Sequence, residues 1–143
     1  VAGKDKRAGR YGQLSVKLGI AGRVRFTGGV SDVKPFLAAA DAFVLPTLYD
    51  PFPNAALEAM ACGLPVVTST KCGAAEIVRE GENGFVRDAL DVTGLADCLD
   101  RLDPETARRL GEAARATVEP LAPDTMAREY LALYERLLAG KLG

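Results

Sequence analysis

The sequence predicts an α/β fold with a Rossmann-like parallel sheet that carries helices on both faces. Short β-rich runs recur at a spacing of roughly twenty residues, as repeated βαβ units require. The segments between those runs have helical periodicity. Nearly half of the residues (48%) are hydrophobic, mostly Ala, Leu and Val, and tryptophan is absent. This composition is typical of a helix-covered sheet rather than an aromatic-rich β sandwich.

Four runs have strand character, and they are residues 24–27, 42–46, 65–69 and 84–86. Residues 1–3 resemble the tail of a buried strand and are followed by a charged loop. Three residues are too few for a typical strand. We therefore expect a fragment that lacks its first βα unit; a short edge strand at a true domain start is the alternative.

Seven segments have helical character: residues 6–18, 32–40, 54–62, 73–80, 91–102, 104–118 and 125–139. Ser31 can cap the second, with Pro35 tolerated in its first turn. Gly63 ends the third helix, at residues 54–62. We expect this helix to be buried and the thiol of Cys62 in it to be inert. The apolar stripe of the last helix should partly cover this domain's own core. Its six residues are Met126, Tyr130, Leu133, Tyr134, Leu137 and Leu138.

Length and composition restrict the function. With 143 residues, the chain is expected to form one domain, and its net charge of −1 gives no reason to expect nucleic acid as a partner. The absence of histidine excludes a Ser-His-Asp triad and the usual zinc sites, and no metal is expected. Three cysteines without paired spacing predict reduced thiols in a cytoplasmic protein, and no apolar run has the length of a membrane span.

The most informative segment runs from Asp50 to Val67. It places Asp50 before a helix and Glu58 inside it, with little side-chain bulk and no positive charge between them. Backbone N–H groups at a helix N-terminus favour a phosphate, and a carboxylate further along can bind sugar hydroxyls. Because apolar residues surround Glu58, we expect a buried carboxylate, which is costly unless it binds something. A surface carboxylate for Glu58 and a turn residue for Asp50 are the alternatives.

Five segments carry a family resemblance: residues 26–30, 40–46, 50–67, 73–78 and 82–86. The chain resembles the C-terminal, donor-binding domain of GT-B glycosyltransferases of group 1 (family 4). Within that family it looks most similar to bacterial glucosyltransferases of the lipopolysaccharide core. The central segment resembles the family's motif of two glutamates separated by seven residues, with Asp50 in place of the first.

The resemblance implies a role for each site residue. Glu58 would accept hydrogen bonds from the ribose hydroxyls of a nucleotide sugar, and Asp50, with the N–H of Phe52, would face the donor sugar. The remaining contacts would be the N–H groups of Asn54, Ala55 and Ala56 at the diphosphate, the backbone of Gly29, Val30 and Ser31 at a uracil, and Lys6 at a phosphate. As an alternative, Lys6 is only part of a solvated charged loop.

The resemblance also implies the activity. The chain would be the donor half, residues 1–143, of a retaining hexosyltransferase that moves a hexose, with glucose expected, from a UDP-sugar to a lipopolysaccharide or other glycan acceptor. No cofactor other than this donor substrate is expected. The helix at 125–139 would cross to a missing N-terminal domain that binds the acceptor. The isolated chain should be inactive, and the full-length protein cytoplasmic or peripheral to the inner membrane.

Two alternatives come from other classes of protein. A non-catalytic α/β module could self-associate as a homo-oligomer through its apolar C-terminal helix and bind no nucleotide. A receiver-like phosphoacceptor domain has similar strand spacing, but it needs an acidic cluster at its strand ends. This chain has Thr27, Pro46 and Ser69 there instead.

Overall fold

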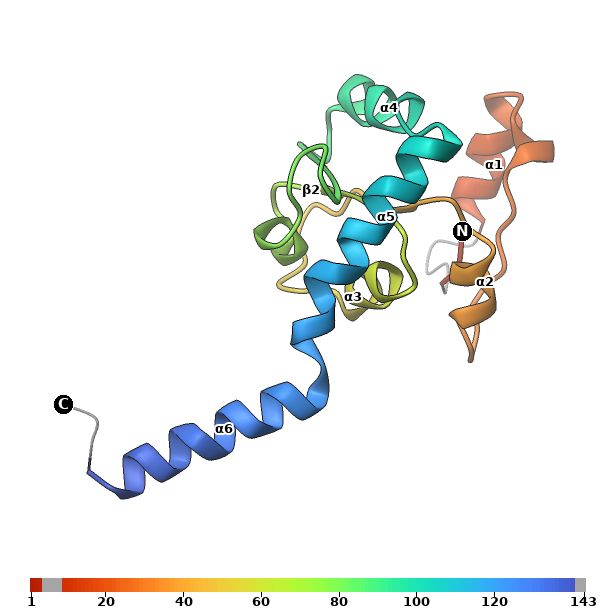
Figure 1. The fold of residues 1–143 in the computed structure, drawn as a ribbon. Helices are drawn as coiled ribbons and strands as arrows, with labels where there is room; N and C mark the ends of the chain where they lie inside the picture. The colour runs from red at the N-terminus through yellow and green to blue at the C-terminus, as the bar shows by residue number, and fades with distance from the viewer. Residues whose placement is uncertain (4–8, 141–143) are drawn as a thin grey trace. The chain divides into compact units, whose positions relative to one another are not determined.

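The structure is a computed structural model of the chain, and it describes residues 1–3 and 9–140 (Figure 1). The chain divides into two compact units, Val1–Pro35 and Phe36–Gly143, which are described separately. Helix α2 (Lys34–Ala38) spans the boundary. It is shorter than the helix predicted at 32–40, and Asp32 rather than Ser31 caps it: the Asp32 carboxylate accepts a hydrogen bond of 3.1 Å from the Lys34 N–H.

The N-terminal unit holds helix α1 (Arg10–Lys17), a 3₁₀ turn η1 (Ala21–Arg23) and one parallel bridge between Ala2 and Gly28. The bridge is supported by the Gly3 N–H donating to the Gly28 carbonyl at 2.8 Å. The strand predicted at 24–27 therefore does not form a regular strand. Among the described residues, it pairs only through the bridge at Ala2, and residues 1–3 are all exposed rather than buried.

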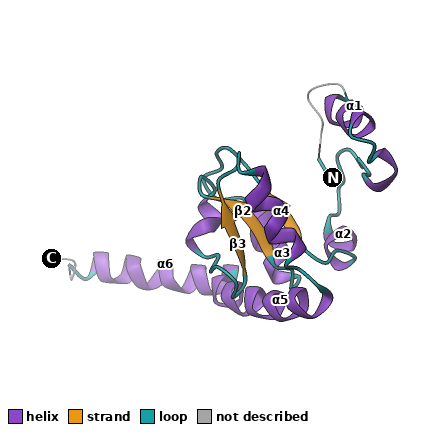
Figure 2. Ribbon diagram, turned by 90° about the horizontal axis from the view of Figure 1, so that it is seen from above, coloured by secondary structure: helices purple, strands orange, loops and turns teal. Residues whose placement is uncertain are grey.

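The C-terminal unit is built on a parallel sheet of three strands, in the order β1-β2-β3 (Figure 2). They are β1 (Phe43–Leu45), β2 (Val66–Ser69) and β3 (Gly84–Arg87), close to the predicted positions. Every residue of β2 is buried, as expected for a central strand. The observed sheet confirms the predicted α/β class.

Three helices pack on this sheet: α3 (Asn54–Ala61), α4 (Val92–Asp100) and α5 (Pro104–Val118). A buried cluster of Val67, Phe85, Cys98 and Leu110 joins two strands to α4 and α5. The Asp103 carboxylate caps α5 by accepting from the N–H groups of Glu105 and Thr106 at 2.9 and 3.1 Å. Local cap and stop signals thus fix these helices where the sequence predicts them.

The helix predicted at 73–80 is reduced to the 3₁₀ turn η2 (Gly73–Glu76). Asn83, fully buried, explains where it ends. Its side-chain oxygen accepts from the Arg79 N–H at 2.7 Å, and its amide donates to the Ile77 carbonyl and the Thr117 hydroxyl, both at 3.0 Å. These bonds hold the chain in a turn and replace those that would continue a helix.

The last helix, α6 (Pro123–Leu138), has no buried residue. The expectation that its apolar stripe covers this domain's own core was wrong. Figures 1 and 2 show α6 leading away from the end of α5, after the short turn η3 (Glu119–Leu121). Among the residues that the structure describes, no helix is both long and apolar enough to span a membrane.

Helices α3 and α5 meet at two glycines. A Cβ atom built on Gly111 would lie 1.9 Å from the carbonyl oxygen of Gly63, so no side chain fits there. Gly63 itself, at φ 79°, ends α3 in the left-handed conformation that favours glycine. The close backbone approach positions the C-terminal end of α3 against α5.

We predict that Gly111→Ala destabilises the protein. Overpacking of this kind costs about 1–3 kcal/mol, which exceeds the gain of about 1 kcal/mol in helix propensity. The measurement is urea unfolding followed by circular dichroism. Gly22→Ala is the control, because its Cβ would meet nothing within 4 Å. A Gly111→Ala protein as stable as the wild type would contradict the packing described.

Glu80, Arg87 and Arg101 form an ion cluster beside β3. The Glu80 carboxylate accepts from the Arg87 guanidinium at 2.8 and 3.0 Å and lies 3.5 Å from that of Arg101, which covers the Phe85 ring. The hydrogen bond from Arg87 lowers the pKa of Glu80, with smaller contributions from the Val86 N–H and the two positive charges. Because the Glu80 side chain is 49% exposed, solvent screens much of this interaction.

A pH dependence follows from the lowered pKa. Ionised Glu80 stabilises the fold above its unfolded pKa of 4.5, and this contribution is lost as pH falls through the lower folded value. We predict that wild type is more stable than Glu80→Gln at about pH 6 and that the difference shrinks towards about pH 3. Thermal unfolding of both proteins across this range is the measurement. A difference independent of pH would show that the carboxylate charge is irrelevant.

Candidate functional site

The loop between β1 and α3 is held by backbone contacts. Asp50, which is half-buried, donates its N–H to the Lys71 carbonyl at 3.2 Å, and its own carbonyl accepts from the Gly73 N–H at 2.9 Å. The carbonyl of Thr47, which precedes Asp50 in the chain, accepts a hydrogen bond from the Ser69 hydroxyl. The backbone of the predicted sugar-binding carboxylate is therefore fixed at both sides of the loop.

Gly73 was not predicted to matter for the site, yet it sets the position of this loop. A Cβ atom on Gly73 would lie 1.7 Å from the Pro51 carbonyl oxygen and 3.1 Å from the Phe52 ring. Only glycine allows the two backbones to approach this closely. The sequence signal available was Gly73 itself, because glycine often marks a close backbone approach.

Helix α3 begins after Pro53, and no side chain caps its N-terminus. Its first turn carries no acidic residue that would compete with an anion. Of the three N–H groups predicted to meet a diphosphate, that of Ala56 is already engaged, donating to the Pro53 carbonyl at 3.0 Å. This leaves the exposed Asn54 and Ala55 as the positions whose N–H groups suit an anion.

Glu58 is exposed, which corrects the expectation of a buried carboxylate. Helix α3 buries only the face that carries Ala56, Ala59 and Met60, and Glu58 projects from another face. Cys62, at the end of the helix, is also exposed rather than buried, while Cys72 and Cys98 are buried. Burial raises the pKa of the Cys98 thiol.

Glu58 faces a groove of about 530 Å³ between α3 and the segment that joins α5 to α6. Asn54, at the start of α3, lines the same groove, as the i, i+4 spacing of the two residues requires. Arg115 and Glu119 bring opposite charges to the other wall. The sequence analysis missed these two residues, because nothing local links α5 to the motif around Glu58.

Of the predicted contacts, Asn54 and Glu58 line this groove, whereas Asp50, Phe52, Ala55 and Ala56 are not among its described lining residues. Gly29, Val30 and Ser31 belong to the N-terminal unit, where they lie in irregular backbone directly after the bridge at Gly28. Gly29 and Ser31 are exposed and Val30 is half-buried. Lys6 lies outside the described residues.

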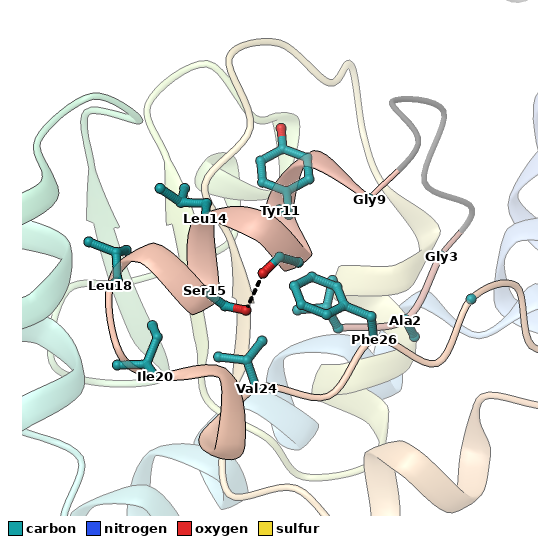
Figure 3. Close-up of a pocket in the computed structure, with 13 residues that line it drawn as sticks. Ala2, Gly3, Gly9, Tyr11, Leu14, Ser15, Leu18, Ile20, Val24 and Phe26 are labelled. Atoms are coloured by element: carbon teal, nitrogen blue, oxygen red, sulfur yellow. Dashed lines mark hydrogen bonds between the residues drawn. The ribbon is translucent and has the colours of Figure 1, made fainter.

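A larger cavity of about 770 Å³ lies in the N-terminal unit, and it is almost wholly apolar (Figure 3). Tyr11, Leu14 and Leu18 of the α1 region face Val24 and Phe26 across it. The buried hydroxyl of Ser15, which lines the cavity, already donates to the Gly12 carbonyl at 2.7 Å. Among the residues that the structure describes, no charged side chain lines this cavity.

The fold and the groove together indicate an α/β protein that binds a ligand beside its parallel sheet. The Asp50 loop and the N-terminus of α3 follow the carboxyl end of β1, which is where α/β proteins with parallel sheets bind their ligands. The family follows from comparison. The chain belongs to the glycosyl transferases of group 1, a family that matches it over residues 1–103, and the resemblance inferred from the sequence is confirmed.

Relatives and solved structures agree with this assignment. The chain is 39% identical, over 108 residues, to the lipopolysaccharide core biosynthesis glycosyltransferase LpsE of Rhizobium meliloti (strain 1021). The aligned region covers 74% of this chain and 32% of LpsE. Sucrose-phosphate synthase from Thermosynechococcus elongatus superposes with a TM-score of 0.83 at 33% identity, covering 96% of this chain and 37% of that one.

HepE from Anabaena, in complex with UDP-glucose, superposes with a TM-score of 0.81 at 26% identity, covering 94% of this chain and 39% of HepE. The fold is therefore that of the GT-B glycosyltransferases. The chain spans between 32% and 39% of the length of these three proteins.

Proposed function

We propose that this chain is the donor-binding half of a retaining hexosyltransferase that takes glucose from UDP-glucose and passes it to a lipopolysaccharide or other glycan acceptor. The observation that carries the proposal is the placement of Asn54 and Glu58 in one groove at the uncapped start of α3. Family membership and the UDP-glucose complex of HepE support the choice of ligand.

In this proposal the helix start holds the diphosphate. The N–H groups of Asn54 and Ala55 point along the helix axis, and the helix dipole adds partial positive charge at the same end. When the sugar leaves, negative charge grows on the diphosphate, so fixed N–H groups stabilise the transition state more than the ground state. The small side chain of Ala55 permits close approach of a phosphate to the backbone.

Glu58 lies one helical turn beyond Asn54 and binds the ribose. An exposed carboxylate accepts hydrogen bonds from two vicinal hydroxyls without first losing an internal partner, and no side-chain hydrogen bond engages Glu58 among the described residues. Asp50, with its backbone fixed on both sides, faces the hydroxyls of the transferred sugar. The acceptor and its binding groups lie in another domain of the transferase.

We predict that the chain binds UDP and that Glu58→Gln weakens this binding by roughly tenfold to a hundredfold, because hydrogen bonds to a charged group contribute about 1.5–3 kcal/mol. Isothermal titration calorimetry with UDP is the measurement. The control is Glu112→Gln, which removes a carboxylate on α5 that pairs with Arg108 at 2.6 Å. Equal affinities of Glu58→Gln and wild type for UDP would show that Glu58 does not bind the nucleotide.

A second prediction concerns Asp50. If it contacts only the sugar, Asp50→Ala should leave the affinity for UDP unchanged and abolish the difference in affinity between UDP-glucose and UDP. Asp50→Asn, which keeps the size and one acceptor oxygen, should retain part of that difference. The measurement is paired calorimetry with the two ligands. A parallel loss for both ligands would instead indicate that Asp50 shapes the loop before α3.

A further inference from the structure

We propose that Thr47 is a positioning residue for Asp50. Its hydroxyl holds the peptide bond between Tyr49 and Asp50, and thereby sets where the Asp50 carboxylate meets the transferred sugar. This role rests on the proposed function, in which Asp50 faces the hydroxyls of that sugar. Thr47 lies three residues before Asp50, in the segment that follows β1.

The Thr47 hydroxyl is hydrogen-bonded to both backbone groups of Tyr49. It donates to the Tyr49 carbonyl at 3.1 Å and accepts from the Tyr49 N–H at 3.3 Å. The Tyr49 carbonyl belongs to the peptide bond that leads into Asp50. The N–H of that same peptide bond, which is the N–H of Asp50, donates to the Lys71 carbonyl at 3.2 Å. The planar peptide group before Asp50 is therefore held at its oxygen and at its nitrogen.

Thr47 is itself attached to two paired strands. Its N–H donates to the carbonyl of Leu45, the last residue of β1, at 3.0 Å. Its carbonyl accepts from the hydroxyl of Ser69, a fully buried residue of β2. Thr68, also fully buried in β2, donates its hydroxyl to the same Leu45 carbonyl at 3.1 Å. The position of Asp50 is thus taken, through Thr47, from the carboxyl ends of β1 and β2.

The short side chain of Asp50 makes this attachment matter. An aspartate has two side-chain torsions, one fewer than a glutamate, so rotation compensates little for a displaced backbone. Hydrogen bonds from sugar hydroxyls to a carboxylate require oxygen–oxygen distances of about 2.5–3.0 Å. A shift of about 1 Å in the loop therefore weakens them, although the carboxylate is still present.

The experiment is isothermal titration calorimetry of the chain with UDP and with UDP-glucose. Thr47→Val keeps the branched shape and removes the hydroxyl. We expect it to leave the affinity for UDP within about twofold of wild type and to move the ratio of the two affinities towards one by roughly threefold to tenfold. Thr47→Ser, which keeps the hydroxyl, should retain the wild-type ratio.

Thr106→Val is the matched control. Thr106 is half-buried like Thr47, and its hydroxyl donates to the Asp103 carboxylate at 2.8 Å in the first turn of α5, outside the Asp50 loop. This variant should keep the wild-type ratio. Circular dichroism checks that each variant is folded, and Thr47→Ala, which also lacks the hydroxyl, takes the place of Thr47→Val if valine prevents folding.

A double-mutant cycle with Asp50→Ala tests whether Thr47 acts through Asp50. If it does, Thr47→Val changes the ratio of affinities when Asp50 is present and has no further effect on that ratio in the Asp50→Ala protein. A purely structural role for Thr47 would instead lower the affinities for UDP and UDP-glucose in parallel, in either background, and would exclude the proposal.

The outcomes separate this proposal from the proposed function. If Asp50→Ala brings the ratio to one while Thr47→Val leaves it at the wild-type value, Thr47 does not position Asp50, and the proposed function stands. Effects of the two substitutions that simply add would also exclude action through Asp50. A chain that binds neither ligand, or a ratio that Asp50→Ala does not change, would overturn the proposed role of Asp50 and the role of Thr47 with it.

Discussion

Helix α3 is held at both ends by backbone contacts that leave no room for a side chain, and the candidate site depends on this constraint. Gly73 allows η2 to contact Pro51 just before the helix starts, and Gly111 allows α5 to contact the Gly63 carbonyl where it ends. Side-chain packing can relax after a substitution, but two backbones in contact cannot. The two contacts therefore fix where the N-terminus of α3 points and where Glu58 lies along the groove.

In the proposed site, this arrangement would separate ligand binding from folding along a single short helix. The buried face of α3, with Ala56, Ala59 and Met60, packs into the core, and its exposed face carries Asn54 and Glu58. A carboxylate on the exposed face is not needed for folding and does not require a partner inside the protein. Its replacement should thus change ligand affinity with little effect on stability, unlike a change at the buried face.

Local signals were sufficient to predict much of this structure. Gly63 marks the end of α3 through its backbone conformation, which depends only on neighbouring residues. The sequence also predicted the Asp50 loop and the start of α3. The reduction of the helix at 73–80 was not predictable, because it depends on Asn83 bonding to Ile77 and Thr117.

Burial was harder to predict than secondary structure. Apolar neighbours suggested a buried Glu58, but a helix has several faces, and only packing decides which one is covered. The same holds for residues 24–27, whose strand character needs a partner of sufficient length, and for Arg115, which reaches the groove from a helix distant in sequence. Each of these properties is set by tertiary contacts that no local pattern contains.

Helix α6 shows the converse case, in which local structure forms with no buried side chain in the described part of the chain. Pro123 at its first turn and its helix-favouring residues suit a helix, yet helices of about 12–15 residues are only marginally stable in water when nothing packs against them. Burying Met126, Tyr130, Leu133 and Leu137 of its apolar stripe would supply the missing stability. Folding of α6 and association through it are therefore thermodynamically linked, so whatever covers this face also determines how completely the helix is formed.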